Sequence, residues 1–382
     1  MISKTIVCDV LVVGSGVSGV CAAVSASRKG TEVVLVEKND FPGGTAIIAM
    51  HRYICGLHLK GVGLEVSRAL NKLEPENKII FMGKLKVLPF QTKHLEIVLR
   101  NLIKAQKKLK VFYNTTLFSL NKEKGLILSV RARRAGMILN IQPKVVIDAS
   151  GEGVVIKLSR ADYQLTPLRE RQMQGFSVRL KGIEVKDQLL SIKVPYSLRK
   201  AAKSKEILKC FRFTTFVFGS AKGEGFCKFN IPYIRGFSIN KNAAIVHNYL
   251  RKALPEFKNS YIAETSPCLV EREGMRLVGE YILTRKDILA SRKFYDAVVR
   301  GDWPIEFWHQ KNGQQVEYLK PGRFYEIPLR VLHSKNIKNL FATGRCISAT
   351  SEAIASSRVM GTCIALGEAA GTAASKYART IS

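Results

Sequence analysis

Residues 8–37 constrain the fold of this chain more strongly than any other stretch. An apolar strand over 10–13 runs into a glycine-rich turn, a helix of small residues follows, and a second apolar strand over 33–36 ends at Glu37. The turn consists of Gly14, Ser15, Gly16, Val17, Ser18 and Gly19. Strand, turn, helix, strand and acid in this order predict a βαβ unit that binds a dinucleotide, rather than a glycine-rich turn without a ligand.

Each glycine of this turn has a separate physical task. Gly14 makes the tight turn, Gly16 lets the backbone approach a pyrophosphate, and Gly19 lets the helix pack closely on the strand. The helix N-terminus offers unpaired N–H groups and the positive end of its dipole to the phosphates. Glu37 lies 18 residues beyond Gly19, where its carboxylate can accept both hydroxyls of an adenosine ribose but would repel a 2′-phosphate.

The segment after Glu37 indicates which dinucleotide binds. An NAD domain would continue with another strand and helix, but here Gly43-Gly44-Thr45 follow within a few residues. Two distant segments agree with a different cofactor. Residues 145–153 form an expected buried strand with a small-residue turn, and residues 339–374 form an expected strand ending at Thr343-Gly344-Arg345 before a long helix rich in Ala, Gly and Ser.

Together these motifs resemble the FAD-dependent oxidoreductase family and, more broadly, the glutathione-reductase-like flavoproteins with two dinucleotide-binding domains. The resemblance extends over most of the chain, including 280–284 and 325–330, and is weakest over 51–90 and 165–260. It implies FAD as the cofactor. In addition to the six turn residues, it implies FAD contacts at Glu37, Lys38, Gly43, Gly44, Thr45, Leu117, Ala149, Ser150, Gly151, Gly344, Arg345, Val359, Met360 and Gly361.

The predicted fold is α/β, with a Rossmann-like FAD-binding domain interrupted by a mostly β substrate domain. The FAD-binding domain, a parallel sheet with an antiparallel meander, is expected from residues 1–50, 91–160 and 325–382. Residues 161–324 are expected to form the substrate domain, and 51–90 to lie near the flavin. Further predicted elements are helices at 91–108, 241–254 and 284–299 and strands at 111–113, 126–133, 137–141 and 144–148.

Three residues are candidates for chemistry at the flavin. The resemblance implies a helix that begins near Val359 and points at the pyrimidine end of the ring, where charge develops on reduction. Arg358 stands at that helix start and is expected to stabilise the flavin or an anionic substrate, or else to pair with Glu352. His51 and Tyr53 follow the Gly-Gly-Thr loop closely enough to reach the ring, and each is either a catalytic or a structural residue.

Four further side chains keep alternatives open. The family frequently has histidine where this chain has Ser351, so this protein needs another base or runs a different reaction. Arg345 either contacts FAD or orders the loop that follows Gly344. Arg272 and Arg276 either bind substrate or form a salt bridge between domains.

Cysteine spacing argues against a metal or disulfide centre. The eight cysteines include no C-x-x-C pair and no clustered Cys/His spacing, so neither a zinc nor an iron–sulfur site is expected. The redox disulfide of disulfide reductases, which would follow Thr45 closely, is missing as well. Most of the thiols are expected to be reduced and buried. Cys55 and Cys346 flank the expected flavin, so the sequence does not decide whether they have a role there.

The charge of +31 is unevenly distributed. Residues 51–260 hold 40 basic and 14 acidic side chains, a net charge of +26. Such a field attracts nucleic acid, anionic membranes or acidic substrates, unless the lysines merely cover solvated faces. Because stacking aromatics are not interleaved with these basic residues, nucleic acid is not the expected partner. The sequence shows neither a signal peptide nor a transmembrane run, so a cytoplasmic location is expected.

The sequence thus predicts an FAD-dependent oxidoreductase that transfers a hydride between bound FAD and a small organic substrate. A second G-x-G-x-x-G is missing, so electrons are expected to leave through substrate exchange, a quinone, a partner protein or dioxygen. Two alternatives stay open: an FAD-dependent enzyme that modifies tRNA, and a catalytically silent FAD-binding subunit.

Overall fold

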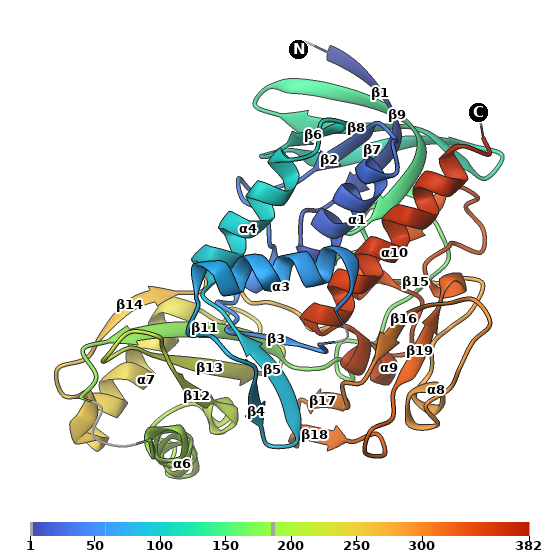
Figure 1. The fold of residues 1–382 in the computed structure, drawn as a ribbon. Helices are drawn as coiled ribbons and strands as arrows, with labels where there is room; N and C mark the ends of the chain where they lie inside the picture. Colours follow the sequence, from blue (N-terminus) through green and yellow to red (C-terminus); the bar gives the residue numbers. More distant parts are fainter. Residues whose placement is uncertain (1–2, 58, 185–187, 382) are drawn as a thin grey trace.

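A seven-stranded sheet forms the centre of the computed structural model, which describes residues 3–57, 59–184 and 188–381. Its main strand order is β6-β2-β1-β9-β8-β7, and β20 also pairs with β9 (Figure 1). The strands are β1 (Ser3–Val13), β2 (Val33–Val36), β6 (Leu109–Phe112), β7 (Thr116–Glu123), β8 (Leu126–Arg134), β9 (Met137–Asp148) and β20 (Leu340–Ala342). β6, β2, β1, β9 and β20 run parallel, whereas β8 and β7 are antiparallel to their neighbours. The predicted α/β fold with a meander is confirmed.

One detail of the meander prediction is wrong. The strands expected at 137–141 and 144–148 are a single strand, β9, because β1 is long enough to pair with it from Ile138 to Asp148. The other edge of β9 changes partner along its length. β8 pairs with it as far as Ile141, and β20 pairs with Val146 to Asp148. A long parallel partner therefore keeps the strand continuous.

Four helices pack over one face of this sheet (Figure 1): α1 (Val17–Arg28), α3 (Gly61–Leu73), α4 (Thr92–Lys104) and α10 (Met360–Ala378). In α4, the predicted apolar face of Leu95, Val98, Leu99, Leu102 and Ile103 is buried. The closest helix packing joins α1 and α10. A Cβ added to Gly367 would lie 2.1 Å from the carbonyl oxygen of Ser18, so the small residues of α10 set how near the two helices come.

A four-stranded antiparallel sheet, ordered β12-β13-β11-β14, forms a second layer system. Its strands are β11 (Gln174–Lys181), β12 (Thr215–Phe218), β13 (Gly225–Ile231) and β14 (Tyr261–Thr265). Helices α6 (Leu190–Lys203) and α7 (Ile239–Ala253) share its apolar core, where the rings of Phe176 and Phe229 stack with centroids 4.5 Å apart. α7 matches the helix predicted near 241–254, whereas α6 has no counterpart among the predicted elements.

The helix predicted over 284–299 is mostly wrong. A capping box between Thr284 and Asp287 starts α8 (Arg285–Leu289), but the backbone at Ser291 has a φ of 52° and the helix has already ended. The following residues form β16 (Ala297–Gly301), which pairs with β19 (Tyr325–Pro328). Pairing with a distant strand thus overrides the local helical pattern.

The expected long C-terminal helix is divided in two. α9 (Ser351–Ser357) ends at Arg358, and Val359 adopts extended backbone, with ψ of 153°, before α10 begins at Met360. The remaining elements are α2 (Thr45–Ile48), β3 (Tyr53–Cys55), β4 (Ile80–Met82), β5 (Leu85–Pro89), α5 (Val154–Ser159), β10 (Tyr163–Gln164), β15 (Arg276–Leu277), β17 (Ile305–His309) and β18 (Gly313–Glu317). Among the described residues, no helix is both long and apolar enough to cross a membrane. The domain boundaries stay a prediction.

Candidate functional site

The turn between β1 and α1 has the backbone geometry predicted for its three glycines. Gly14 has a φ of 99°, and a Cβ there would lie 2.6 Å from the carbonyl oxygen of Ala149. A Cβ on Gly19 would lie 1.9 Å from the carbonyl oxygen of Gly14. A Cβ on Gly16, by contrast, would have no atom of the described chain within 4 Å, so the backbone there faces open space. This open space fits a group that approaches the main chain, as a pyrophosphate does.

The Gly-Gly-Thr loop lies directly against this turn. Gly43 donates its N–H to the carbonyl oxygen of Ser15 at 2.7 Å and forms a parallel bridge with Gly16. A Cβ on Gly44 would lie 3.1 Å from the Cα of Gly16, and Thr45 then begins α2. The loop therefore lies beside the open backbone of the turn, and its contact with a phosphate stays a prediction.

Glu37 is buried and joins the turn to the next connection. Its Oε2 accepts the backbone N–H of Ser15 at 2.7 Å and the Ser15 hydroxyl at 3.0 Å. Its Oε1 accepts the backbone N–H of Asn39 at 2.9 Å and the Asn39 side-chain amide at 2.8 Å. Ribose hydroxyls would thus share this carboxylate with, or replace, the Ser15 and Asn39 side chains.

The other two residues predicted near the adenosine are placed less directly. Lys38 lies at the surface and forms an ion pair with Glu152 at 2.7 Å. The backbone N–H of Thr115 donates to the Glu37 carbonyl at 2.8 Å, so the 114–116 stretch does run beside the acid. The Leu117 side chain, however, is buried in the apolar core. Any adenine contact at Leu117 would have to come from its backbone.

The predicted segments at 149–151 and 343–345 meet the turn from its other side. The hydroxyls of Ser18 and Thr343 are 2.7 Å apart, and a Cβ on Gly344 would lie 3.3 Å from that of Ser18. Arg345 donates from Nη1 to the carbonyl oxygen of Glu271, and its Nη2 would lie 2.7 Å from a Cβ on Gly151. Arg345 therefore orders this loop by bridging it to the 271–276 segment.

Sequence reasoning missed the residue that organises the 149–151 turn. Asp148 is fully buried at the end of β9 and accepts the Ser150 hydroxyl at 2.6 Å and the N–H groups of Val155 and Ile156 at 2.8 and 3.0 Å. Burial raises the pKa of this carboxyl, which the hydrogen bonds partly offset. An acid at the end of a buried strand, just before a small-residue turn, was the available signal.

Comparison with protein families accounts for the turn together with the segments at 43–45, 149–151 and 343–345. A model of the family described as FAD dependent oxidoreductase matches residues 9–381. The chain belongs to this family. It is an FAD-dependent oxidoreductase with FAD as its cofactor, and the open backbone at Gly16 fits the pyrophosphate of that group. The individual residues expected to contact FAD stay predictions.

Curated relatives match only parts of the chain. A digeranylgeranylglycerophospholipid reductase of Methanothrix thermoacetophila is 29% identical over 191 residues, which cover 46% of this chain and 48% of that protein. A 4-oxocyclohex-2-ene-1-carboxylate 5-dehydrogenase of Sinomonas cyclohexanicum is 51% identical over 47 residues, 12% of this chain and 8% of that protein. The chain thus spans less than half the length of these two relatives.

Solved structures share the fold at low sequence identity. A geranylgeranyl bacteriochlorophyll reductase-like protein of Thermoplasma acidophilum has a TM-score of 0.52 at 14% identity, over 99% of this chain and 79% of that chain. The flavin-dependent brominase Bmp2 has a TM-score of 0.52 at 12% identity, over 98% and 79%. The flavin-dependent monooxygenase PieE, solved with FAD and substrate, has a TM-score of 0.50 at 12% identity, over 90% and 53%.

In this FAD-dependent oxidoreductase, the start of α10 lies against the 51–57 segment. A Cβ on Gly361 would lie 2.0 Å from the carbonyl oxygen of Gly56. Val359 and Met360 form the N-cap and first turn of α10, as predicted. The segment that carries His51 and Tyr53 and the helix start that follows Arg358 are therefore neighbours, although about 300 residues separate them in the sequence.

Four basic side chains gather beside this contact: His51, Lys228, Arg272 and Arg358. Burial, with the charges of the other three, lowers the pKa of His51 to about 3. Burial lowers the pKa of Lys228 to about 8, and burial with the charge of Arg358 lowers that of Arg272 to about 9. Lys228 also lies 5.8 Å from the ring centroid of Tyr53, whose pKa is raised by burial. These shifts reflect half-buried basic groups held close together.

Arg358 and Gln172 keep unused donors in this cluster. Arg358 donates from Nη2 to Oε1 of Gln172 at 3.4 Å, so its described hydrogen bond is not to Glu352. Nε of Arg358 and Nε2 of Gln172 are buried and have no hydrogen-bond partner among the residues that the structure describes. Both unused groups are donors, and a bound acceptor would satisfy them.

One carboxylate, Glu306, is shared by the cluster. Its charge favours the protonated forms of Lys228, Arg272 and Arg358 alike. Its oxygens already accept hydrogen bonds from Trp303 at 3.1 Å, and from Trp308 and Gln314 at 3.0 Å. Glu273 also acts on Arg358, but it is already paired with Arg276, so positive charge remains in excess at this place.

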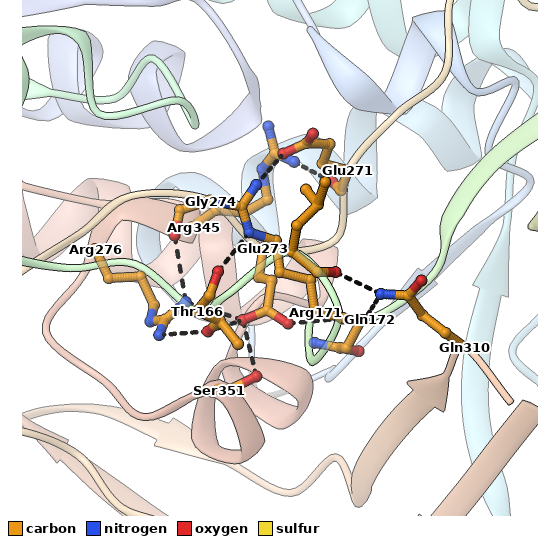
Figure 2. Close-up of polar contacts among 11 residues, drawn as sticks. Thr166, Arg171, Gln172, Glu271, Glu273, Gly274, Arg276, Gln310, Arg345 and Ser351 are labelled. Carbon is orange, nitrogen blue, oxygen red and sulfur yellow. Dashed lines mark hydrogen bonds and ion pairs between the residues drawn. The ribbon is translucent and has the colours of Figure 1, made fainter. Parts of the chain in front are cut away.

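Arg272 and Arg276, which the sequence could not separate, have different surroundings. Figure 2 shows Arg276 in a buried ion pair with Glu273 at 2.9 Å, and it also donates to the carbonyl oxygen of Ala349 at 2.8 Å. Arg272 donates to the carbonyl oxygen of Met173 at 2.6 Å and lies 4.9 Å from the ring centroid of Trp308, within the basic cluster. Arg272 also donates from Nη2 to Oδ1 of Asn230. Arg276 therefore lies in a buried ion pair, whereas Arg272 lies within the basic cluster.

Glu273 is a second residue that sequence reasoning missed. It is fully buried and accepts the Ser351 hydroxyl at 2.8 Å, the Thr166 hydroxyl at 2.8 Å and the backbone N–H of Gln172 at 2.8 Å (Figure 2). Ser351, found where the family frequently has histidine, therefore has a structural partner. Through Gln172, this network holds the 172–173 backbone next to Arg358.

The two cysteines left open are not activated thiols. Cys55 lies half-buried in β3, and burial raises its pKa to about 12. Cys346 is buried, and burial likewise raises its pKa. All eight cysteines are free in the structure. A thiol with a raised pKa is protonated at neutral pH and is a poor nucleophile.

Proposed function

We propose that this FAD-dependent oxidoreductase transfers a hydride between FAD and a small organic substrate that carries an anionic group. The observation that supports this is the basic cluster of His51, Lys228, Arg272 and Arg358, which shares one carboxylate. Half-buried positive charges held together, with two buried donors unused beside them, favour the binding of an anion. FAD supplies the hydride chemistry; the protein binds and orients the substrate.

Each member of the cluster has a distinct part in this proposal. Lys228 and Arg272 bind the substrate anion, and Arg272 is held for it by Met173, Asn230 and the Trp308 ring. Arg358 and Gln172 offer their unused donors to negative charge at the start of α10. His51 is uncharged at neutral pH because its pKa is lowered to about 3, so one ring nitrogen is free to accept a proton.

Substrate binding also tunes this proton acceptor. The positive charges of Lys228, Arg272 and Arg358 all hold the pKa of His51 down. A bound anion cancels part of that charge, so the pKa of His51 rises and its basicity increases when substrate is present. The dehydrogenase from Sinomonas cyclohexanicum, similar over 47 residues, is named for a carboxylate substrate, which agrees with an anionic group.

The proposal is tested by titrating the purified flavoprotein with benzoate and with methyl benzoate while recording its visible spectrum. We expect saturable perturbation by benzoate but not by the neutral ester. Lys228→Gln should weaken benzoate binding at least about tenfold, equivalent to about 1.4 kcal/mol. Lys222→Gln, an exposed lysine just before the same strand, is the matched control and should behave as wild type. Equal perturbation by acid and ester would contradict an anion site.

A further inference from the structure

The tip of the β4–β5 hairpin exposes an unbroken run of large apolar side chains. Ile79 is 56% exposed, Ile80 40%, Phe81 67% and Met82 44%. Gly83, with a φ of 60°, makes the turn that projects these residues. Single exposed apolar side chains are ordinary on a protein surface, but four in succession at a hairpin tip mark an interaction site.

The charged side chains within the hairpin have one sign. Lys78, Lys84 and Lys86 are exposed, and residues 77–86 contain no acidic residue. Lys86 lies over the ring of Phe81, with Nζ 5.6 Å from the centroid, and Lys84 lies 5.5 Å from the ring centroid of Tyr318. An apolar tip ringed by lysines matches a surface that is apolar inside and anionic at its boundary.

Helix α6 presents the same combination. Ile192 is 66% exposed and Tyr196 69% exposed, and they lie one turn apart on the helix. The next turns of this face carry the exposed Arg199, Lys200 and Lys203. In the view of Figure 1, α6 and the β4–β5 hairpin both lie at the lower edge of the molecule, whereas the two chain ends lie at the upper edge.

We propose that the β4–β5 hairpin and the outer face of α6, here called the docking face, bind this enzyme to an anionic phospholipid surface. The apolar tip enters the acyl boundary, and the lysines of both elements contact lipid phosphates and carboxylates. A second copy of the chain is a poorer occupant, because lysine-rich faces of two copies would repel each other. Docking by this face requires no helix that spans the bilayer.

The docking face is continuous with the candidate active site through a shared sheet. β5 pairs with β4 on one side and with β3 on the other, where Tyr53 is opposite Pro89 and Cys55 opposite Val87. β3 carries Tyr53, which lies under Lys228 of the basic cluster. The hairpin therefore lies one strand away from the strand that carries Tyr53. The proposal itself does not depend on the substrate of the enzyme.

The test is co-sedimentation of the FAD-loaded enzyme with vesicles of phosphatidylcholine alone or mixed with phosphatidylserine. We expect binding to the mixed vesicles only. Phe81→Ser combined with Met82→Ser should lower the partition coefficient about tenfold or more. The control is Val7→Ser, which removes an apolar side chain 74% exposed on β1 at the opposite edge and should bind as wild type.

A second pair of variants tests the charge. Changing Lys78, Lys84 and Lys86 to Gln should abolish most binding, whereas the same change at exposed Lys4, Lys107 and Lys110 should leave at least half of it. Flavin content and the visible spectrum report whether each variant is folded. Equal binding to neutral vesicles, or equal loss in both lysine triples, would overturn the proposal. So would a wild-type dimer that the Phe81 variant dissociates without any vesicle binding, since the face would then join two copies.

Discussion

Arg358 and Gln172 share one hydrogen bond, from Nη2 to Oε1 at 3.4 Å, and each keeps a second buried donor without a partner in the described part of the chain. The two residues are 186 positions apart, on the turn before α10 and on the segment that leads into β11. Two unsatisfied donors at one place are uncommon in a folded protein and indicate a missing acceptor. The start of α10 adds its own positive dipole end to them.

Replacing Arg358 tests whether this acceptor is charged. Arg358→Ala should lower the reduction potential of the bound flavin and slow its half-reduction, because a cation that favours added negative charge is removed. Each tenfold loss of rate corresponds to about 1.4 kcal/mol of barrier. FAD content should not change, and Arg358→Lys should recover part of the potential. A variant with wild-type potential and wild-type reductive rate would assign Arg358 to structure alone.

Substitutions of two glycines in the turn before α1 should affect different properties, one FAD binding and the other stability. Gly16 has ordinary backbone angles (φ −56°, ψ 169°) and open space where a Cβ would be, so Gly16→Ala should fold normally but bind FAD at least about tenfold more weakly. Gly19→Ala forces a contact of 1.9 Å with the carbonyl oxygen of Gly14 and should destabilise the protein by about 1–3 kcal/mol. Urea denaturation of the apoprotein and fluorimetric FAD titration separate the two effects. A Gly16 variant that retains FAD fully would contradict the predicted pyrophosphate position.

The pH dependence of benzoate binding follows from the lowered pKa of Lys228. The ammonium form binds the anion, and it is lost as pH rises through about 8, so the benzoate dissociation constant should be flat below that pH and rise above it. Arg272, whose pKa is lowered to about 9, loses its positive charge at higher pH, and benzoate binding should weaken a second time there. His51 stays uncharged throughout. Lys228→Arg should move the first rise of the benzoate dissociation constant to higher pH. If the dissociation constant of that variant rises at the same pH as in wild type, the titrating group is not Lys228.

The tRNA alternative is tested by salt dependence. Binding through phosphates weakens with salt with a log–log slope of about −0.7 to −0.9 per contacted phosphate. Because Lys200, Lys203, Lys205 and Lys209 are exposed without stacking aromatics at regular intervals, we expect weak tRNA binding that disappears at about 0.15 M salt. Tight binding that persists at that salt and fails when these four lysines are changed to Gln would favour a tRNA-modifying enzyme.

The parts of this protein that could be predicted from sequence depend on local geometry. The tight turn at Gly14 and the close packing at Gly19 follow from backbone sterics within a few residues, and the structure has both. The buried face of α4 follows from helical periodicity in the same way. The helix expected over 284–299 was wrong because β16 pairs with a strand about 25 residues away, a contact that no local pattern contains.

The basic cluster could not be predicted for the same physical reason. Lys228 comes from β13, Arg272 from the loop before β15, and Gln172 from the segment before β11, so no spacing in the sequence joins them. Lys228 stands between the buried Cys227 and Phe229 in a mostly apolar strand. A lysine inside such a strand was the signal available, but only the folded arrangement shows that it faces Arg272 and His51.

The cofactor released when the purified chain is denatured tests the FAD site most directly. The family of the chain supports FAD as the cofactor, and we predict that it binds at the open backbone of Gly16, the loop at Gly43 and the buried acid Glu37. We predict a yellow protein that releases FAD at close to one molecule per chain, identified by chromatography against FMN and NAD standards. Release of FMN, or of NAD without flavin, would contradict this assignment of the site.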